Sequence, residues 1–269
     1  MMASGCDTPL PLRPVTRRAD HGAMASAPTE SVSPGPPNHK LGTRRATLMA
    51  VALLIVTNLV DNRWAPTWGL LTAPVAAALL LGVLRWSGGT WAEAGLGRGT
   101  FGRGARWALV LIGIVAAVYV VGALLPITRD LFADRRTSGL SGLQVADRML
   151  LRVPIAVVLL EETAFRGVLL ALLLRQYGRT RAAALSSTLF GLWHVLPSLH
   201  LSTDKPEFTK LLGSGPLGGA IADLGAVLFT AAAGALLCEL RWRSRSLLAP
   251  MGLHWATNAL GYLAAYLLA

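Results

Sequence analysis

After residue 44 the chain alternates between long apolar runs and short polar segments. The apolar runs cover residues 46–60, 67–84, 107–126, 150–174, 182–200, 216–239 and 247–268. A helix needs about 20 apolar residues to cross a hydrocarbon core of about 30 Å. The pattern therefore predicts an all-α protein, a polytopic transmembrane helical bundle of about seven to eight spans. The eighth would be a weaker stretch at 131–146.

The composition supports this class of protein. Of the 269 residues, 53% are hydrophobic and only 14% are charged, and the mean hydropathy is +0.52. A soluble domain carries about 25% charged residues, so a soluble protein of this length is excluded. Residues 1–44 differ from the rest, because they hold seven of the fifteen prolines and no apolar run. They predict a disordered N-terminal tail ahead of a transmembrane domain at 45–269.

The net charge of +11 comes from basic residues that lie between the apolar runs. This placement indicates anchoring among membrane lipids and no nucleic-acid partner. With the N-terminus inside, sixteen Lys and Arg residues fall in inside segments and eight in outside segments; without the tail the counts are ten and eight. Inside segments are enriched in Lys and Arg. We therefore expect an integral protein of the plasma (cytoplasmic) membrane with its N-terminus inside.

The fourth apolar run contains three ionisable residues in the stretch LLEETAFRGVLL, residues 159–170. A charge at mid-membrane costs several kcal/mol and persists mainly where it is paired or functional. Glu162 and Arg166 are spaced i, i+4, so they can form an ion pair. Glu161 is rotated by about 100° from Glu162. We expect it to point elsewhere and to remain free as a base. A structural ion pair beside a protonated glutamate is the alternative.

Two later runs contain histidines. FGLWHV (190–195) contains His194, and MGLHWATNAL (251–260) places His254 and Asn258 one turn apart on one face. Glu161 and His194 are expected about 20 Å and 18 Å from the inner ends of their helices, and His254 only about 10 Å. The three can meet only if the last helix is tilted or its boundary is shifted.

Glu, His, His and Asn together are suited to peptide hydrolysis, which needs a base for water and donors for the oxyanion. Glu161 with His194 can hold and deprotonate a water molecule, while His254 and Asn258 can donate to the oxyanion. Glutamate and histidine also bind zinc, so Glu161, His194 and His254 are alternative candidate ligands of a divalent metal. The HExxH pattern of common zinc proteases is absent. The residues leave both a metal-free site and a zinc site open.

Three motifs stand in order along the chain: EETAFR (161–166), FGLWH (190–194) and HWATN (254–258). They resemble the signature EExxxR, FxxxH and HxxxN or HxxxD of the CPBP intramembrane proteases, also called the CAAX prenyl protease 2 or Abi family. Each motif alone is weakly specific, and all three together are strongly specific. The likeness covers about residues 145–269, which we take as the motif-bearing core.

The resemblance implies a role for each matching residue. Glu161 becomes the base that activates water, with His194 as its partner. His254 and Asn258 become the oxyanion donors. Glu162 and Arg166 become a supporting ion pair, and Glu162 also shares in catalysis.

The resemblance also implies the activity, an intramembrane endopeptidase acting on membrane-associated or lipidated peptide or protein substrates. CaaX-type processing and bacteriocin-related maturation or immunity are the processes it suggests. Two other functions stay open: a catalytically silent family member that acts as an immunity or scaffold protein, and a proton-coupled transporter with a Glu–His relay. Transporters often contain paired repeats. This chain shows none, which favours the hydrolase.

Overall fold

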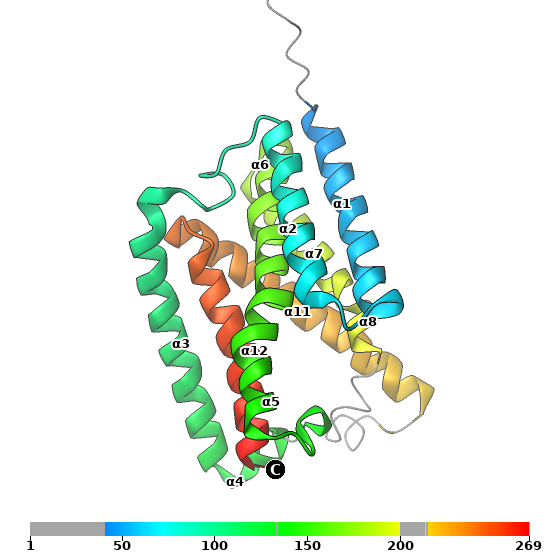
Figure 1. Ribbon diagram of the computed structural model, residues 1–269, viewed down its shortest axis with the longest axis vertical. Coiled ribbons are helices and arrows are strands. Elements are labelled where there is room, and N and C mark those ends of the chain that lie inside the picture. Colours follow the sequence, from blue (N-terminus) through cyan, green and yellow to red (C-terminus); the bar gives the residue numbers. More distant parts are fainter. Residues whose placement is uncertain (1–40, 133, 200–212, 214, 269) are drawn as a thin grey trace, which may run out of the picture. The chain divides into compact units, whose positions relative to one another are not determined.

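The computed structural model describes residues 41–132, 134–199, 213 and 215–268, so the predicted tail lies almost entirely outside the described residues. The described chain is all-α, and its seven long helices follow the seven predicted apolar runs (Figure 1). The long helices are α1 (Thr43–Leu59), α2 (Gly69–Trp86), α3 (Phe101–Leu124), a composite helix at 142–177, α7 (Arg179–Trp193), α11 (Pro216–Ser244) and α12 (Leu248–Leu268).

Short helical turns connect the long helices. They are η1 (Val60–Trp64), η2 (Arg98–Thr100), α4 (Pro126–Arg129), η3 (Asp130–Phe132), η4 (Arg135–Thr137) and α8 (Val195–Ser198). The predicted eighth span at 131–146 is wrong. The described part of that stretch contains only such turns and the beginning of the composite helix.

Four described helical segments are long and apolar enough to cross a membrane: Thr43–Trp64, Gly69–Trp86, Arg98–Leu124 and Pro216–Ser244. Four of the predicted spans are thus supported by length and composition, and the other spans stay predictions. The composite helix, α7 and α12 do not meet this standard of length and hydropathy. They are the helices that carry the candidate site. The composite helix is charged, α7 has only 15 residues, and polar and aromatic residues interrupt α12.

The composite helix lies at the centre of the described bundle. It runs from α5 (Gly142–Asp147) through the π-helical segments η5 (Arg148–Leu159) and η6 (Glu162–Leu169) to α6 (Leu170–Tyr177). Every residue from 160 to 173 is buried, and α1, α2 and α7 pack against this stretch (Figure 1). The charged residues of this buried stretch, Glu161, Glu162 and Arg166, are therefore enclosed by protein. π-Helical turns often mark functional sites.

Glycines allow α7 and α11 to pack closely. A Cβ atom on Gly234 of α11 would stand 3.2 Å from Ser187 and Phe190 of α7, and one on Gly191 would stand 2.6 Å from the Val227 carbonyl oxygen. Small residues at such contacts let helix backbones approach each other. The close contact fixes the C-terminal end of α7, where His194 follows.

The connection between α2 and α3 holds the start of α12. Arg241 Nη2 donates to the carbonyls of Ala92 and Glu93 at 3.2 and 2.9 Å, and Leu247 N donates to the Gly95 carbonyl at 3.0 Å. Hydrogen bonds from Arg175 hold the pKa of the Glu93 carboxyl below its ordinary value. As Figure 1 shows, α12 begins below the upper ends of α2 and α6. This shifts the last helix deeper into the bundle.

Candidate active site

The residues of the three motifs meet around Glu161, near the middle of the composite helix. His194 follows the last residue of α7, and His254 lies in the second turn of α12. The predicted difference in depth between His254 and the other two is removed by the deep start of α12. From the sequence, the three residues could meet only with a tilt or a boundary shift of the last helix, and the structure shows a boundary shift.

Glu162 joins two of the motifs. Its Oε1 lies 3.1 Å from Arg166 Nη1 and 2.7 Å from His254 Nδ1. The side chains of Glu162 and Arg166 are fully buried, and the Arg166 guanidinium lies 3.8 Å from the centroid of the Phe190 ring. The predicted i, i+4 ion pair is confirmed. The structure adds that the same carboxylate orients His254.

Glu161 faces both histidines. Its Oε2 lies 3.9 Å from His194 Nε2 and 3.7 Å from His254 Nε2, and its Oε1 accepts a hydrogen bond of 3.0 Å from the indole of Trp193. Only Glu162 pairs with Arg166, whereas both glutamates lie against His254. The expectation that Glu161 remains free as a base stays a prediction. The two glutamates approach opposite nitrogens of His254, because that ring is inserted between them.

The hydrogen bonds place a proton on Nδ1 of each imidazole. His194 Nδ1 lies 2.8 Å from the Phe190 carbonyl oxygen, which can only accept, so Nδ1–H donates. His254 Nδ1–H donates in the same way to Glu162, since an ionised carboxylate is an acceptor. Both Nε2 atoms are left to face Glu161 Oε2. That oxygen is buried and makes no hydrogen bond within the described chain.

A cavity of about 890 Å³ opens beside this cluster, and Glu161 and His194 line it. Asn258 also lines the cavity, is half-buried, and makes no side-chain hydrogen bond to a described residue. The structure thus links five of the six predicted residues by pairwise contacts, from Arg166 through Glu162, His254 and Glu161 to His194. Asn258 lines the same cavity as Glu161 and His194.

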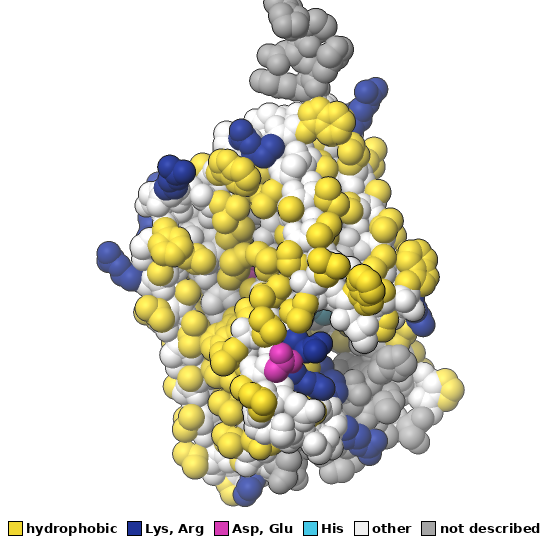
Figure 2. Space-filling model, viewed as in Figure 1, with side chains coloured by type: hydrophobic (Ala, Val, Ile, Leu, Met, Phe, Trp, Pro, Cys, Tyr) yellow, Lys and Arg dark blue, Asp and Glu magenta, His cyan; other side chains and the backbone are white. Residues whose placement is uncertain are grey.

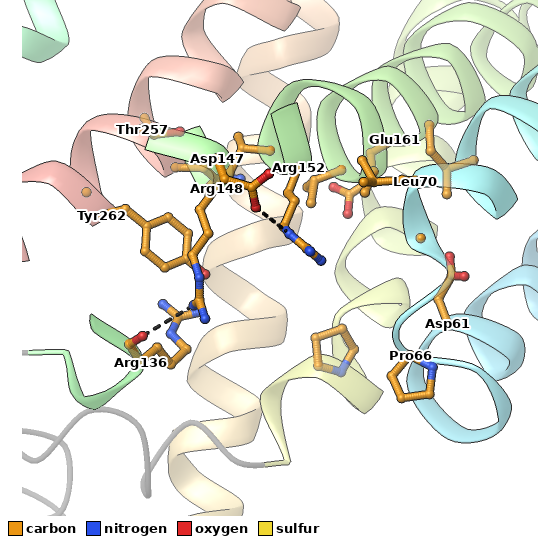
Figure 3. A pocket seen from close by; sticks show the side chains of 18 of the residues that line it. Asp61, Pro66, Leu70, Arg136, Asp147, Arg148, Arg152, Glu161, Thr257 and Tyr262 are labelled. Atoms are coloured by element: carbon orange, nitrogen blue, oxygen red, sulfur yellow. Dashed lines mark hydrogen bonds and ion pairs between the residues drawn. The ribbon is translucent and has the colours of Figure 1, made fainter. Parts of the chain in front are cut away.

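The outer part of the cavity is charged. Arg148 and Arg152 of η5 line it together with Asp147, and Arg152 Nε pairs with Asp147 at 2.7 Å (Figure 3). Arg148 lies over the Tyr262 ring at 5.7 Å. Figure 2 shows acidic and basic side chains gathered below a largely apolar face. The cavity therefore leads from a polar mouth to the buried glutamate.

The zinc alternative can be compared with the donor geometry. Zinc takes histidine nitrogens at about 2.0–2.1 Å and carboxylate oxygens at about 2.0–2.2 Å. No group of three or more His, Cys, Asp or Glu side chains among the described residues is arranged to hold a metal ion. The proposed ligands Glu161, His194 and His254 do not fit such a site, and no step below passes through a metal.

Trp193 is the contact that sequence reasoning did not assign. The sequence shows it only as the neighbour of His194, where cavity lining and ordinary packing are equally good interpretations. The structure buries it to 9% exposure. The one signal in the sequence was a residue with an N–H donor beside a motif histidine.

The fold and the site together define the class of protein. Four described helices are long and apolar enough to cross a membrane, so the chain is an integral membrane protein, and its buried glutamates and histidines lie beside a cavity. Residues 147–260 match the model of the family described as type II CAAX prenyl endopeptidase Rce1-like, and this part of the chain is a domain of that family. The family resemblance is thereby confirmed. The family implies an endopeptidase with peptide substrates. No curated protein and no solved structure matches the chain.

Proposed function

We propose that the chain is an intramembrane endopeptidase in which Glu161 and His194 activate the attacking water. One observation carries the proposal, namely the separations of 3.7 and 3.9 Å between Glu161 Oε2 and the two imidazole Nε2 atoms. Such separations are too long for direct hydrogen bonds. They suit a water molecule bound by the carboxylate and an imidazole together.

In the proposed reaction, this water gives a proton to Glu161 as its oxygen attacks the carbonyl carbon of the peptide bond. A carbon–oxygen bond forms, and the carbonyl electron pair moves onto oxygen. Glu161 then passes the proton to the amide nitrogen as the carbon–nitrogen bond breaks. The products are a carboxylic acid and an amine, and the base is restored.

The oxyanion needs donors, and we propose His254 and Asn258 for this role. With neutral imidazoles, the buried cluster contains two carboxylates and one guanidinium, that of Arg166. A proton on His254 makes the cluster neutral, which low-dielectric surroundings favour. His254 Nε2–H and the Asn258 amide then donate from successive turns of α12. Removing one such donor costs about 100- to 1,000-fold in rate.

The substrates we propose are membrane-associated or lipidated peptides and proteins. The matched family is one of prenyl endopeptidases, and the cavity has room for several residues of a peptide. CaaX-type processing and bacteriocin-related maturation or immunity are the two processes proposed.

The test is cleavage of a panel of prenylated and of unmodified membrane-tethered peptides by the purified protein, with and without a chelator. We expect cleavage, at a rate that chelation changes less than twofold. Loss of cleavage on chelation, restored by zinc, would contradict the metal-free mechanism. No cleavage of any peptide would favour a silent immunity or scaffold protein, or a proton-coupled transporter.

We further propose a plasma-membrane location with the N-terminus inside, from the distribution of arginines. The cavity mouth, at the α5 end of the bundle, would then face outward. In a chain with Cys6→Ser, a cysteine at the exposed Leu143 of α5 should react with a membrane-impermeant maleimide on intact cells. A cysteine at Tyr177, at the other end of the composite helix, should react only after permeabilisation. The reverse pattern would invert the orientation.

A further inference from the structure

A glutamate can act as a base on a bound water only if one oxygen is kept aimed at that water. Glu161 is 7% exposed, and its carboxylate can rotate about its terminal bond. The described residues supply Oε1 with one hydrogen bond, the 3.0 Å contact with Trp193 Nε1. Indole N–H is a donor only and exchanges no proton with a carboxylate at ordinary pH. It can therefore hold Oε1 without competing for the catalytic proton.

Trp193 is itself held from a second direction. In a continuous helix its carbonyl would accept from the backbone N–H of residue 197. That residue is Pro197, which has no N–H. The buried Asn58 of α1 supplies the missing donor, because its Nδ2 lies 2.7 Å from the Trp193 carbonyl oxygen. The Trp193 ring also packs edge-on against Phe165, with centroids 5.8 Å apart.

We infer that Trp193 is a positioning residue for Glu161, and that Asn58 holds Trp193 in place. The inference rests on the proposed function and names two residues that act on its base. Asn58 lies outside the family-matched region 147–260, so α1 contributes to the site as well as to the bundle. The same two contacts fix the break after α7 from which His194 projects.

The test compares Trp193→Phe with Trp255→Phe. Trp255 is a matched control, because its indole donates a hydrogen bond of similar length, 2.9 Å, to the Met149 carbonyl rather than to a carboxylate. Trp193→Phe should lower kcat about 10- to 30-fold, the effect of one lost hydrogen bond to a charged group, with KM within twofold. Trp255→Phe should leave both constants within twofold.

Asn58→Leu tests the second contact. It removes the donor to the Trp193 carbonyl and leaves the indole intact, so kcat should fall about 3- to 10-fold with KM unchanged. Size-exclusion profiles and melting temperatures in detergent accompany each variant. They separate the loss of a positioning contact from a general loss of folded protein.

Two outcomes would overturn the inference: a Trp193→Phe protein with wild-type kcat, or an equal loss of kcat in Trp255→Phe. The proposed function would still stand after either result, provided that the wild type cleaves the peptides and the Glu161→Gln variant does not. An inactive wild type on every peptide of the panel would remove the proposed function, and this inference with it.

Discussion

Replacing Glu161 by Gln is expected to lower kcat by about 1,000-fold or more, which removes measurable proteolysis in most assays. The amide keeps the shape of the side chain, and its oxygen can still accept the hydrogen bond of Trp193. What it loses is the ability to take a proton from water. The variant should therefore remain folded, inserted in the membrane and unchanged in melting temperature. The measurement is single-turnover cleavage of the best peptide in the panel.

Glu239→Gln is the matched control for this change. Glu239 lies on α11, is partly exposed, and pairs with Arg179 and Arg243, neither of which belongs to the buried cluster. Exposed ion pairs contribute little to stability, so the control should keep wild-type kcat. If both Glu161→Gln and Glu239→Gln kept the wild-type kcat, Glu161 would not be the base.

Replacing Arg166 by Met is expected to cause the largest loss of stability. The ion pair with Glu162 is completely buried. Removing only the guanidinium leaves a buried carboxylate whose remaining described partner is His254. Breaking a buried pair in this way costs about 3–5 kcal/mol. For a chain of this size, the melting temperature in detergent should fall by roughly 10 °C, and activity should fall with it.

The double variant Glu162→Gln with Arg166→Met separates charge from packing. It removes both charges together, and replacing a whole buried pair is often nearly neutral. We expect most of the lost melting temperature to return, while kcat stays low because His254 has lost its ionised partner. An unchanged melting temperature in the single variant would contradict the account of the pair.

The apolar runs predicted the seven long helices because burial of apolar surface depends on the residue types themselves. The apolar pattern did not separate the four helices that are long and apolar enough to cross a membrane from the other three long helices. It could not show that the composite helix and α12 place their polar residues inside the bundle. It also could not exclude an eighth span at 131–146, since a weak apolar stretch is compatible with short turns.

The motif spacing found the five residues that the structure links by pairwise contacts, and Asn258, which lines the cavity with Glu161 and His194. Only one of their contacts was determined by the sequence alone. The pairing of Glu162 with Arg166 is set by helix periodicity, since the two residues belong to one turn.

The other contacts were decided by tertiary structure. His254 reaches Glu162 because α12 begins against the connection between α2 and α3. Glu161 is held by Trp193, whose carbonyl depends on Asn58 of another helix. A pattern along the chain fixes which residues share a helix face, because the backbone repeats at a known interval. The depth at which separate helices meet depends on how their side chains pack, and that is a property of the folded bundle.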